Sequence, residues 1–306
     1  MNRSPGISVI MPVYNGEKFL KEAVESILNQ TFKDFEFLIV YDESTDETLS
    51  IIQGFQEQDE RVVLINGDKE GISGALNKGI EKARGKYIAR LDADDISLPT
   101  RFETQINHME SLGLDICGGH SLLIDSDGKV NGIGVVPRSH DLCGLSMMFM
   151  VPFAHSSVMI LKGFLTNSSL KYQGNYEDLD LWTRMFSAGA KFGNVDDIVI
   201  RYRVLAVSLS TIHATGARRY NRGVLKSFRV EHQRYLSDVI KHINIGLLSE
   251  SEKSLVARYR INKAITRLEL FGLYKLRGIS LKTVVIMALS EIQRMLTKYA
   301  WWSFVK

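Results

Sequence analysis

The sequence has little cysteine and no long apolar run, and both absences narrow the possible classes of protein. Cys117 and Cys143 are the only cysteines among 306 residues, and they lack metal-site spacing or an accompanying histidine motif. We therefore expect buried free thiols in a protein of a reducing compartment. No apolar run approaches the roughly 18 residues that a transmembrane helix needs.

Signals for secretion and for disorder are also missing. The first apolar run, Ile7 to Val13, has no long basic flank and ends in the turn Tyr14-Asn15-Gly16 instead of a cleavage site. With 45% hydrophobic and 24% charged residues, the composition indicates an ordinary globular chain with one large core and a smaller appendage.

The charge is divided unevenly along the chain. Residues 216–306 hold 18 Lys and Arg against 6 Asp and Glu, whereas residues 1–215 hold 20 against 29. We expect the basic region to face an anionic membrane and not nucleic acid, because no nucleic-acid-binding motif accompanies the charge. Aromatic residues near its end favour a membrane interface, namely Tyr299, Trp301, Trp302 and Phe304.

The first 115 residues alternate short apolar runs with amphipathic stretches, which predicts the order β-α-β-α. The expected strands are 7–13, 35–42, 62–66 and 87–92, and the expected helices are 17–30, 45–56, 73–83 and 99–111. Near-continuous hydrophobicity in the strands predicts an α/β fold with a mainly parallel sheet covered on both faces. Ligands of such sheets bind beyond the carboxyl ends of the strands.

The pattern loosens between about residues 115 and 203. Shorter strands are expected within 115–125 and 155–162, with a turn at 125–129 and a helix at 177–187. We expect this part to supply a second half of the site. Beyond residue 216 the apolar spacing predicts helices throughout.

Three carboxylates are crowded into the segment YIARLDADD. Asp92, Asp94 and Asp95 raise one another's pKa and destabilise the fold unless a cation or water compensates their charge. Hard oxygen ligands at a strand end suit Mg²⁺ or Mn²⁺, which substrate phosphates usually complete. A solvated acidic turn is the alternative for so short a pattern.

Polar residues follow all four expected strands and therefore converge on one edge of the sheet. Five motifs in this order resemble family 2 of the inverting glycosyltransferases, which have the GT-A fold: PVYN (12–15), YDESTD (41–46), GISGALNKGI (71–80), LDADD (91–95) and YEDLDLW (176–182). The resemblance covers about residues 6–210. It implies transfer of a sugar from a nucleotide-sugar, usually a UDP-sugar, with a divalent metal bridging the diphosphate.

The resemblance, the loosened pattern after residue 115 and the basic region beyond residue 216 together predict a division of the chain. Residues 1–215 become the GT-A domain, with a nucleotide-sugar half at 1–114 and an acceptor half at 115–215. Residues 216–306 become a basic, helical, membrane-associating region. Donor contacts are implied for Pro12, Tyr14, Asn15, Asp42, Gly71, Asn77 and Asp92.

Asp42 ends a buried strand, where its carboxylate can accept a hydrogen bond from a uracil N–H. It matches the second acid of the family's usual DDGSTD, whereas Tyr41 replaces the first. The alternative is that Asp42 only helps to start the next helix. Ser44 and Glu47 have the spacing of a capping box, which leaves Asp42 for the nucleotide.

The resemblance gives the crowded acids separate roles. Asp92 faces the ribose, Asp94 binds the metal, and Asp95 supports the loop or the acceptor. Residues 92 and 94 share one face of an extended segment while Ala93 points away. The loop 70–74 brings glycines near the same edge, where they permit close backbone approach.

The base for the incoming hydroxyl is expected at the start of the helix 177–187. The family's ED motif places the general base at Asp178, beside Glu177. The alternative is that both acids only meet the dipole of the helix N-terminus. Trp182, one turn later, offers either a stacking face for an acceptor sugar or a core side chain.

One departure from the family concerns its usual YRxH, because Leu205 stands where the histidine is expected. Arg203 is predicted to meet the diphosphate instead. His155 stays outside the catalytic set, since a lone histidine is more often structural.

The predicted function is transfer of a hexose, Glc or Gal, from a UDP-sugar to a polyprenyl-diphosphate-linked sugar in bacterial polysaccharide or O-antigen assembly. The enzyme is expected in the cytoplasm, peripherally bound to the inner face of the cell membrane. A sugar-nucleotide pyrophosphorylase needs a glycine-rich basic loop after the first strand, which PVYNGEK does not supply. A DxD phosphotransferase carries its nucleophile after the first strand and not the fourth. A non-catalytic membrane scaffold remains as the other alternative.

Overall fold

The computed structural model describes residues 4–174, 177–205 and 214–259, with the backbone alone for 214–222. The chain divides into two units, residues 1–232 and 233–306. The division falls inside helix α9 (Ala214–His242) and not at the expected boundary 215/216. The first unit contains every predicted site residue.

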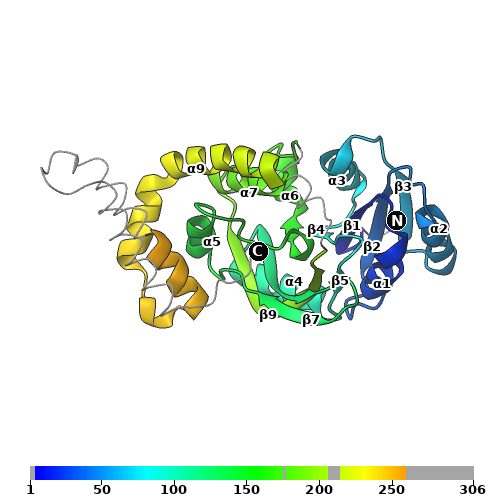
Figure 1. Ribbon diagram of the computed structural model, residues 1–306, viewed down its shortest axis with the longest axis horizontal. Coiled ribbons are helices and arrows are strands. Elements are labelled where there is room, and N and C mark those ends of the chain that lie inside the picture. The colour runs from blue at the N-terminus through cyan, green and yellow to red at the C-terminus, as the bar shows by residue number, and fades with distance from the viewer. Residues whose placement is uncertain (1–3, 175–176, 206–213, 260–306) are drawn as a thin grey trace, which may run out of the picture. The chain divides into compact units, whose positions relative to one another are not determined.

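Parallel strands carry the first half of this unit (Figure 1). They are β1 (Ile7–Val13), β2 (Phe35–Tyr41), β3 (Val62–Asn66) and β4 (Tyr87–Arg90), in the order β3-β2-β1-β4. The helices after them are α1 (Glu17–Leu28), α2 (Thr48–Gln58), α3 (Gly71–Lys82) and α4 (Arg101–Leu112). All bounds lie within three residues of the prediction.

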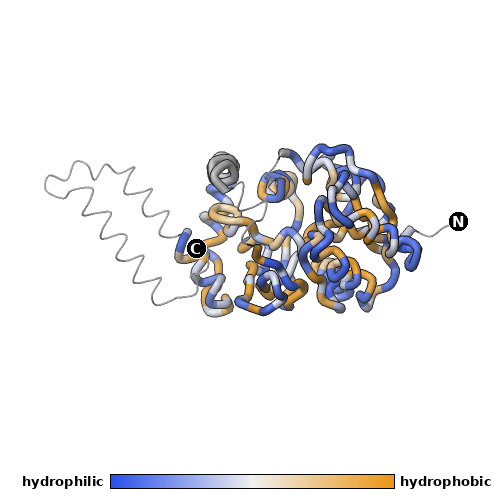
Figure 2. The backbone as a smooth tube through the Cα atoms, turned by 45° about the vertical axis from the view of Figure 1, so that its right-hand side comes forward, coloured by the Kyte–Doolittle hydropathy of each residue, from blue (hydrophilic) through white to orange (hydrophobic). Residues whose placement is uncertain are grey.

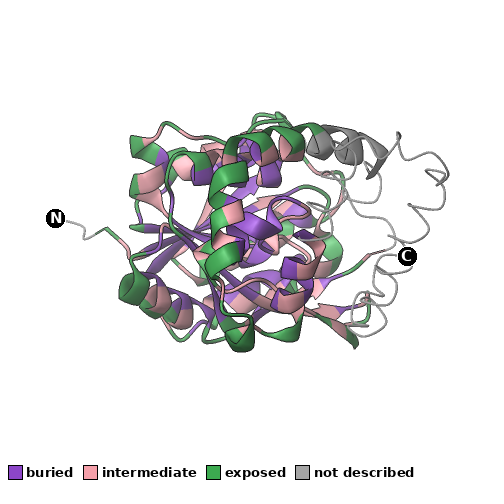
Figure 3. Cartoon of the chain, turned by 90° about the vertical axis from the view of Figure 1, so that its left-hand side faces the viewer, coloured by how far each residue is buried: buried purple, intermediate pink, exposed green. Residues whose placement is uncertain are grey.

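Both faces of this sheet are covered, as the hydrophobicity of the strands predicts. Val9 and Met11 of β1 join a core with Leu20 of α1 and Ile52 of α2. On the other face, α3 approaches so closely that a Cβ at Gly79 would lie 2.6 Å from the side chain of Ile10. Figure 3 shows the strands as the most buried part of the fold.

Strands of the second half return to the sheet over longer distances in sequence. They are β6 (Ile116–Ile124), β7 (Val130–Gly134), β8 (Met159–Leu161) and β9 (Phe192–Arg203), and the short β5 (Ile96–Ser97) of the first half joins them. β8 pairs antiparallel with both β4 and β6, whereas β9 runs parallel to β6 and antiparallel to β5. The full order is β3-β2-β1-β4-β8-β6-β9-β5, with β7 on β6.

Short helices connect these strands: α5 (His140–Ser146), the 3₁₀ turn η1 (His155–Ser157), α6 (Lys162–Asn167) and α7 (Glu177–Ser187). The bounds of α7 and the turn at 125–129 are confirmed. The segment 155–162, expected as one strand, is η1 followed by the short β8. The sequence analysis did not identify β9.

Loops of neighbouring βα units cap each other at the site edge. Glu17 N donates to Asp46 Oδ2 (3.1 Å), so the second loop caps α1. The expected capping box is wrong, because α2 begins at Thr48 with Glu47 at its N-cap and no side-chain cap bond. Ser44 is instead engaged by the first loop, since its Oγ accepts the Asn15 N–H (2.9 Å).

The second unit is described only to residue 259. It contains η2 (Ile245–Leu247) and a helical stretch at 250–259, and its buried residues include Leu236, Val256 and Tyr259. The helices expected beyond residue 216 are confirmed as far as the description goes. The aromatic terminus Tyr299, Trp301, Trp302 and Phe304 lies outside the described residues.

Hydropathy along the backbone alternates over short distances (Figure 2). Among the described residues, no helix has both the length and the apolar character that crossing a bilayer requires.

Candidate active site

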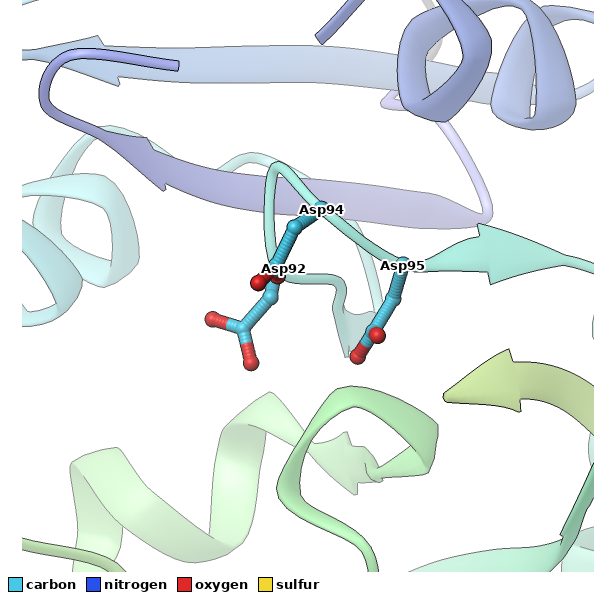
Figure 4. Close-up of side chains that lie close together, drawn as sticks. All are labelled: Asp92, Asp94 and Asp95. Atoms are coloured by element: carbon cyan, nitrogen blue, oxygen red, sulfur yellow. The ribbon is translucent and has the colours of Figure 1, made fainter. Parts of the chain in front are cut away.

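The acidic turn after β4 brings its three carboxylates together. Asp92, Asp94 and Asp95 each offer one oxygen, and these oxygens lie within 4.8 Å of one another. Figure 4 shows the three side chains on the same side of the turn. The crowding expected from the sequence is therefore present in three dimensions.

Asp92 is neutralised by a buried arginine that the sequence analysis missed. Arg90, 4% exposed, donates from both terminal nitrogens to the two oxygens of Asp92. Ser156 Oγ also donates to Asp92 Oδ2 (3.1 Å) and accepts the Asp92 N–H (2.9 Å). An arginine inside an apolar strand was the signal in the sequence, because such a charge needs a buried partner.

Burial and the crowding of the three acids raise the pKa values of Asp94 and Asp95. Burial, and then the charge of Asp92, raises the pKa of Asp94 to about 6. The same causes raise the pKa of Asp95, which is 1% exposed, well above its ordinary value.

One carboxylate oxygen of Asp95 lacks a hydrogen-bond partner in the described part of the chain, and this indicates whether a cation fits the turn. Asp95 Oδ1 accepts the Arg203 N–H (2.7 Å), but its buried Oδ2 has no hydrogen-bond partner among the described residues. A buried carboxylate oxygen without a donor is costly, and a divalent cation would satisfy it. The donors are all hard carboxylate oxygens, so the residues present fit Mg²⁺ or Mn²⁺.

Arg203 does not face a diphosphate, and that prediction is wrong. Its Nε donates to the Asp94 carbonyl (2.9 Å), and a terminal nitrogen donates to Glu22 Oε2 (2.7 Å). The other terminal nitrogen reaches the carbonyls of Asp125 and Ser126. Its side chain is 2% exposed, so Arg203 holds the acidic turn from inside the protein.

The first two strand ends form a second polar cluster. Asn15 Oδ1 accepts the Thr45 N–H (2.9 Å), and the Tyr41 hydroxyl accepts the Ser44 N–H (3.0 Å). Tyr14 lies on the same turn and is 64% exposed, while Pro12 is half-buried within β1. The two loops therefore form one connected surface with an accessible aromatic ring.

Asp42 is half-buried in this cluster. Its Oδ1 accepts the Lys69 N–H (3.2 Å), and a Cβ at Gly67 would lie 1.9 Å from the same oxygen. A glycine at position 67 is therefore needed for the observed position of Asp42.

Gly71 and Asn77, which were expected to contact the donor, both lie on α3. Gly71, with φ of +70°, is the first helical residue and not part of a loop. The Asn77 side chain makes two hydrogen bonds of 2.9 Å with the backbone N–H and carbonyl of Tyr172. Asn77 thus holds the chain shortly before α7, and its contact with a donor stays a prediction.

Asp178 and Glu177 begin α7 in different surroundings. Burial raises the pKa of Asp178, and the charge of Arg90 partly opposes this. Glu177 is 7% exposed, and although burial alone would raise its pKa, the interaction with His155, a backbone hydrogen bond and the charge of Arg90 together lower it. Arg90 pairs directly with Asp92, and its positive charge also acts to lower the pKa of Glu177 and of Asp178, so it influences acids from both halves of the fold.

His155 belongs to this cluster, although the sequence analysis placed it outside the catalytic set. Its Nδ1 lies 3.4 Å from Glu177 Oε1, and its Nε2 lies 3.0 Å from the Tyr172 hydroxyl. Trp182 is fully buried and packs edge-on against Phe153 and His155. Its predicted role as an acceptor platform is therefore wrong, and it is a core side chain.

The amino-acid sequence of this chain is similar to those of glycosyltransferases. The family model described as "Glycosyl transferase family 2" matches residues 8–153. An uncharacterised glycosyltransferase of Methanocaldococcus jannaschii, MJ1057, is 35% identical over 65% of this chain and 71% of its own length. The O-antigen biosynthesis glycosyltransferase WbnJ of Escherichia coli is 32% identical over 65% of this chain and 79% of its own length.

Solved structures share the fold. TarS of S. aureus, residues 1–349 in complex with UDP-GlcNAc, has a TM-score of 0.58 and 19% identity over 90% of this chain and 76% of that one. The mannosyltransferase PcManGT of Pyrobaculum calidifontis, in complex with GDP-Man and Mn²⁺, has a TM-score of 0.57 and 15% identity over 99% of this chain and 84% of that one. The fold is GT-A, and with the sequence matches above, the chain belongs to glycosyl transferase family 2.

Proposed function

We propose that this protein is an inverting glycosyltransferase that moves a hexose, Glc or Gal, from a UDP-sugar to an acceptor hydroxyl. The observation that carries the proposal is that two separate carboxylate groups lie beside residues 155 and 156, since Ser156 donates to Asp92 (3.1 Å) and His155 lies 3.4 Å from Glu177. The acids after β4 suit a nucleotide diphosphate and its cation, whereas Asp178 on α7 suits the nucleophile. Transfer by a single displacement needs both functions.

A pyrimidine base suits the geometry at Asp42. Oδ1 is already engaged by the Lys69 N–H, so Oδ2 is the oxygen available to a ligand. Uracil presents one ring N–H, whereas guanine presents a ring N–H and an amino group that together match both oxygens of a carboxylate. The exposed ring of Tyr14 would stack on the base.

The residues that would hold a divalent cation are Asp94 and Asp95. Asp94 is the ligand expected from the sequence, and the unsatisfied Oδ2 of Asp95 adds a second oxygen. When bound, the cation supplies positive charge to the leaving diphosphate. Asp92, held by Arg90, would accept a hydrogen bond from the ribose.

Asp178 would act as the general base. Its raised pKa improves its ability to accept the proton of a sugar hydroxyl, which is a very weak acid. Its Oδ1 accepts the Leu179 N–H (2.6 Å), which fixes the carboxylate at the N-terminus of α7. The acceptor oxygen then attacks opposite the diphosphate, and the anomeric configuration inverts.

Donor panels with and without metal test this proposal. We expect UDP-Glc or UDP-Gal with Mn²⁺ to raise the melting temperature, and EDTA or the variant Asp94→Asn to abolish the rise. GDP-Man serves as the control donor. Release of UDP should require an acceptor sugar, and near-normal turnover by folded Asp94→Asn or Asp178→Asn would contradict the assigned roles. A non-catalytic scaffold would release no UDP with any donor.

The acceptor is proposed to be a polyprenyl-diphosphate-linked sugar at the cytoplasmic face of the cell membrane. Support comes from the relative named for O-antigen biosynthesis and from the basic region 216–306, with its 18 Lys and Arg against 6 Asp and Glu. Each basic residue near an anionic leaflet contributes on the order of 1 kcal/mol.

Vesicle binding tests the membrane proposal separately from catalysis. The chain has three tryptophans, of which Trp182 is fully buried, so a change of emission on binding would report Trp301 and Trp302. We expect a blue shift with phosphatidylglycerol vesicles, weakened by salt, and none with phosphatidylcholine. Equal binding to both vesicle types would exclude the electrostatic attachment.

A further inference from the structure

The 3₁₀ turn η1 carries two neighbouring side chains that contact different parts of the site. Ser156 contacts Asp92, on the side of the leaving group. His155 contacts Glu177, the residue before the proposed base. Both contacts are made by side chains of one 3₁₀ turn, although Asp92 and Glu177 lie in different halves of the fold.

Ser156 is fully buried and uses its hydroxyl completely. It donates to Asp92 Oδ2 (3.1 Å), and it accepts from the Asp92 N–H (2.9 Å) and from Arg90 (3.2 Å). The hydroxyl thus fixes both the backbone and the carboxylate of Asp92. Its removal leaves the Asp92 N–H without a partner and the Asp92 carboxylate held by Arg90 alone.

His155 is held at both ring nitrogens. Nδ1 contacts Glu177 Oε1 (3.4 Å), and Nε2 contacts the Tyr172 hydroxyl (3.0 Å). Tyr172 is itself held by Asn77 of α3. The histidine therefore joins the first turn of α7 to the sheet and to α3.

The turn itself is firmly built. Ser157 Oγ and N both donate to the Ala154 carbonyl (2.7 and 2.8 Å), and the Ser157 carbonyl accepts from Gln105 (2.8 Å). Ser157 is fully buried, like Ser156. Such a turn can hold its two side chains at a fixed separation, because these hydrogen bonds fix its backbone on both sides of Ser156.

We propose that η1 positions the two carboxylate groups of the reaction: Ser156 orients Asp92 for the donor, and His155 orients Glu177 and thereby the base Asp178. The inference rests on the proposed function, since it assigns no new reaction. Both are positioning residues, because neither touches the reacting atoms. Adjacent residues should then show different kinetic effects.

Ser156→Ala should weaken the donor side. We expect the Kd for UDP with Mn²⁺, measured by calorimetry, and the KM for the donor to rise about tenfold, with kcat within about twofold of the parent. Ser157→Ala is the matched control, because Ser157 lies in the same buried turn but bonds only to Ala154 through its side chain. It should leave both constants within about twofold.

His155→Gln should weaken the nucleophile side. A glutamine amide can replace Nε2 toward Tyr172 but not Nδ1 toward Glu177, so we expect kcat to fall about tenfold while the Kd for UDP stays constant. An asparagine amide replaces Nδ1, so His155→Asn should retain most of kcat. His120→Asn is the control, because His120 is similarly buried and lies 3.3 Å from Asp196 at another place in the sheet.

The outcomes separate this inference from the proposed function. Near-normal kcat in His155→Gln, equal losses in the Gln and Asn variants, or a kcat effect in Ser156→Ala without a change in Kd would overturn the inference. Tyr172→Phe, which removes only the second partner of His155, replaces His155→Gln if that variant does not fold and should also lower kcat at constant Kd. If Asp178→Asn keeps normal turnover, the proposed function fails instead.

Discussion

The half of the fold built from residues 7–112 and the half built from residues 116–203 hold their site residues in different ways. In the first half, the polar clusters after β1, β2 and β3 join loops of neighbouring βα units, as Asn15 does with Thr45 and Asp42 with Lys69. In the second half, the partners lie far apart in sequence. Arg203 at the end of β9 reaches Asp95, and Ser156 reaches Asp92. The first half follows from a repeating pattern, whereas the second depends on tertiary packing.

Removing the proposed base should have the largest effect and would show that the second half carries the nucleophile chemistry. We expect Asp178→Asn to lower kcat by roughly 10³-fold, because a general base contributes about 10² to 10⁴. The Kd for UDP should not change, since the acids after β4 remain intact. Steady-state kinetics with calorimetry checks both.

Asp180→Asn is the matched control for that variant. Asp180 lies on the same first turn of α7 but pairs with Arg184 (2.6 Å). A loss of activity as large as that of Asp178→Asn would mean that acids at this helix start act through the helix and not as a base.

Removing the Arg203 side chain, which joins the two halves, should have the next largest effect, and that effect is on stability. Arg203→Met removes a buried guanidinium and its bonds to Glu22 and to the partly buried carbonyl groups of Asp94 and Asp125, so we expect the free energy of unfolding to fall by about 3 kcal/mol. Urea denaturation measures it. Lys86→Met is the control, because its pair with Glu110 is half-exposed and should contribute less than about 1 kcal/mol. Equal effects would contradict the buried role of Arg203.

Much of the first half could be predicted because its signals are local. Buried parallel strands read as continuous apolar runs, and the residue after each strand end lies at the ligand edge whatever the rest of the chain does. This is why the positions of Asn15, Asp42 and the acids after β4 agree with the prediction. Arg90 was missed because its partner, Asp92, had already been assigned to a ligand.

The second half was harder to predict for a physical reason. β9 is bulged against β6, with register shifts near Gly118 and His120, so no simple alternation marks it in the sequence. The environment of Arg203 depends on carbonyl groups, which no sequence motif reveals. Trp182 shows the same limit, because a tryptophan one turn after the base is compatible with a ligand face or with the core until its packing is known.

The pH dependence of transfer should show how closely the two acids of α7 interact. Asp178 accepts a proton only when it is ionised, and burial raises its pKa, so kcat should fall about tenfold per pH unit below that pKa. The negative charge of Glu177 raises the same pKa. Glu177→Gln should therefore move the acidic limb to lower pH, whereas Asp180→Asn should leave it in place. A shift of the limb to higher pH would exclude this coupling.

The smallest effect is expected in the first half, at the residue that departs from the family's usual DDGSTD. The Tyr41 hydroxyl accepts the Ser44 N–H and so fixes the loop beside Asp42 and Asn15. Tyr41→Phe removes one hydrogen bond worth about 1 kcal/mol, so the Kd for UDP should rise about fivefold while kcat stays constant. Tyr87→Phe is the control, because Tyr87 is also a buried strand tyrosine whose hydroxyl bonds elsewhere, to Glu110 (3.1 Å). If both variants bind UDP equally well, Tyr41 supports only the fold, and the donor surface of the first half depends on Asn15 and Asp42 alone.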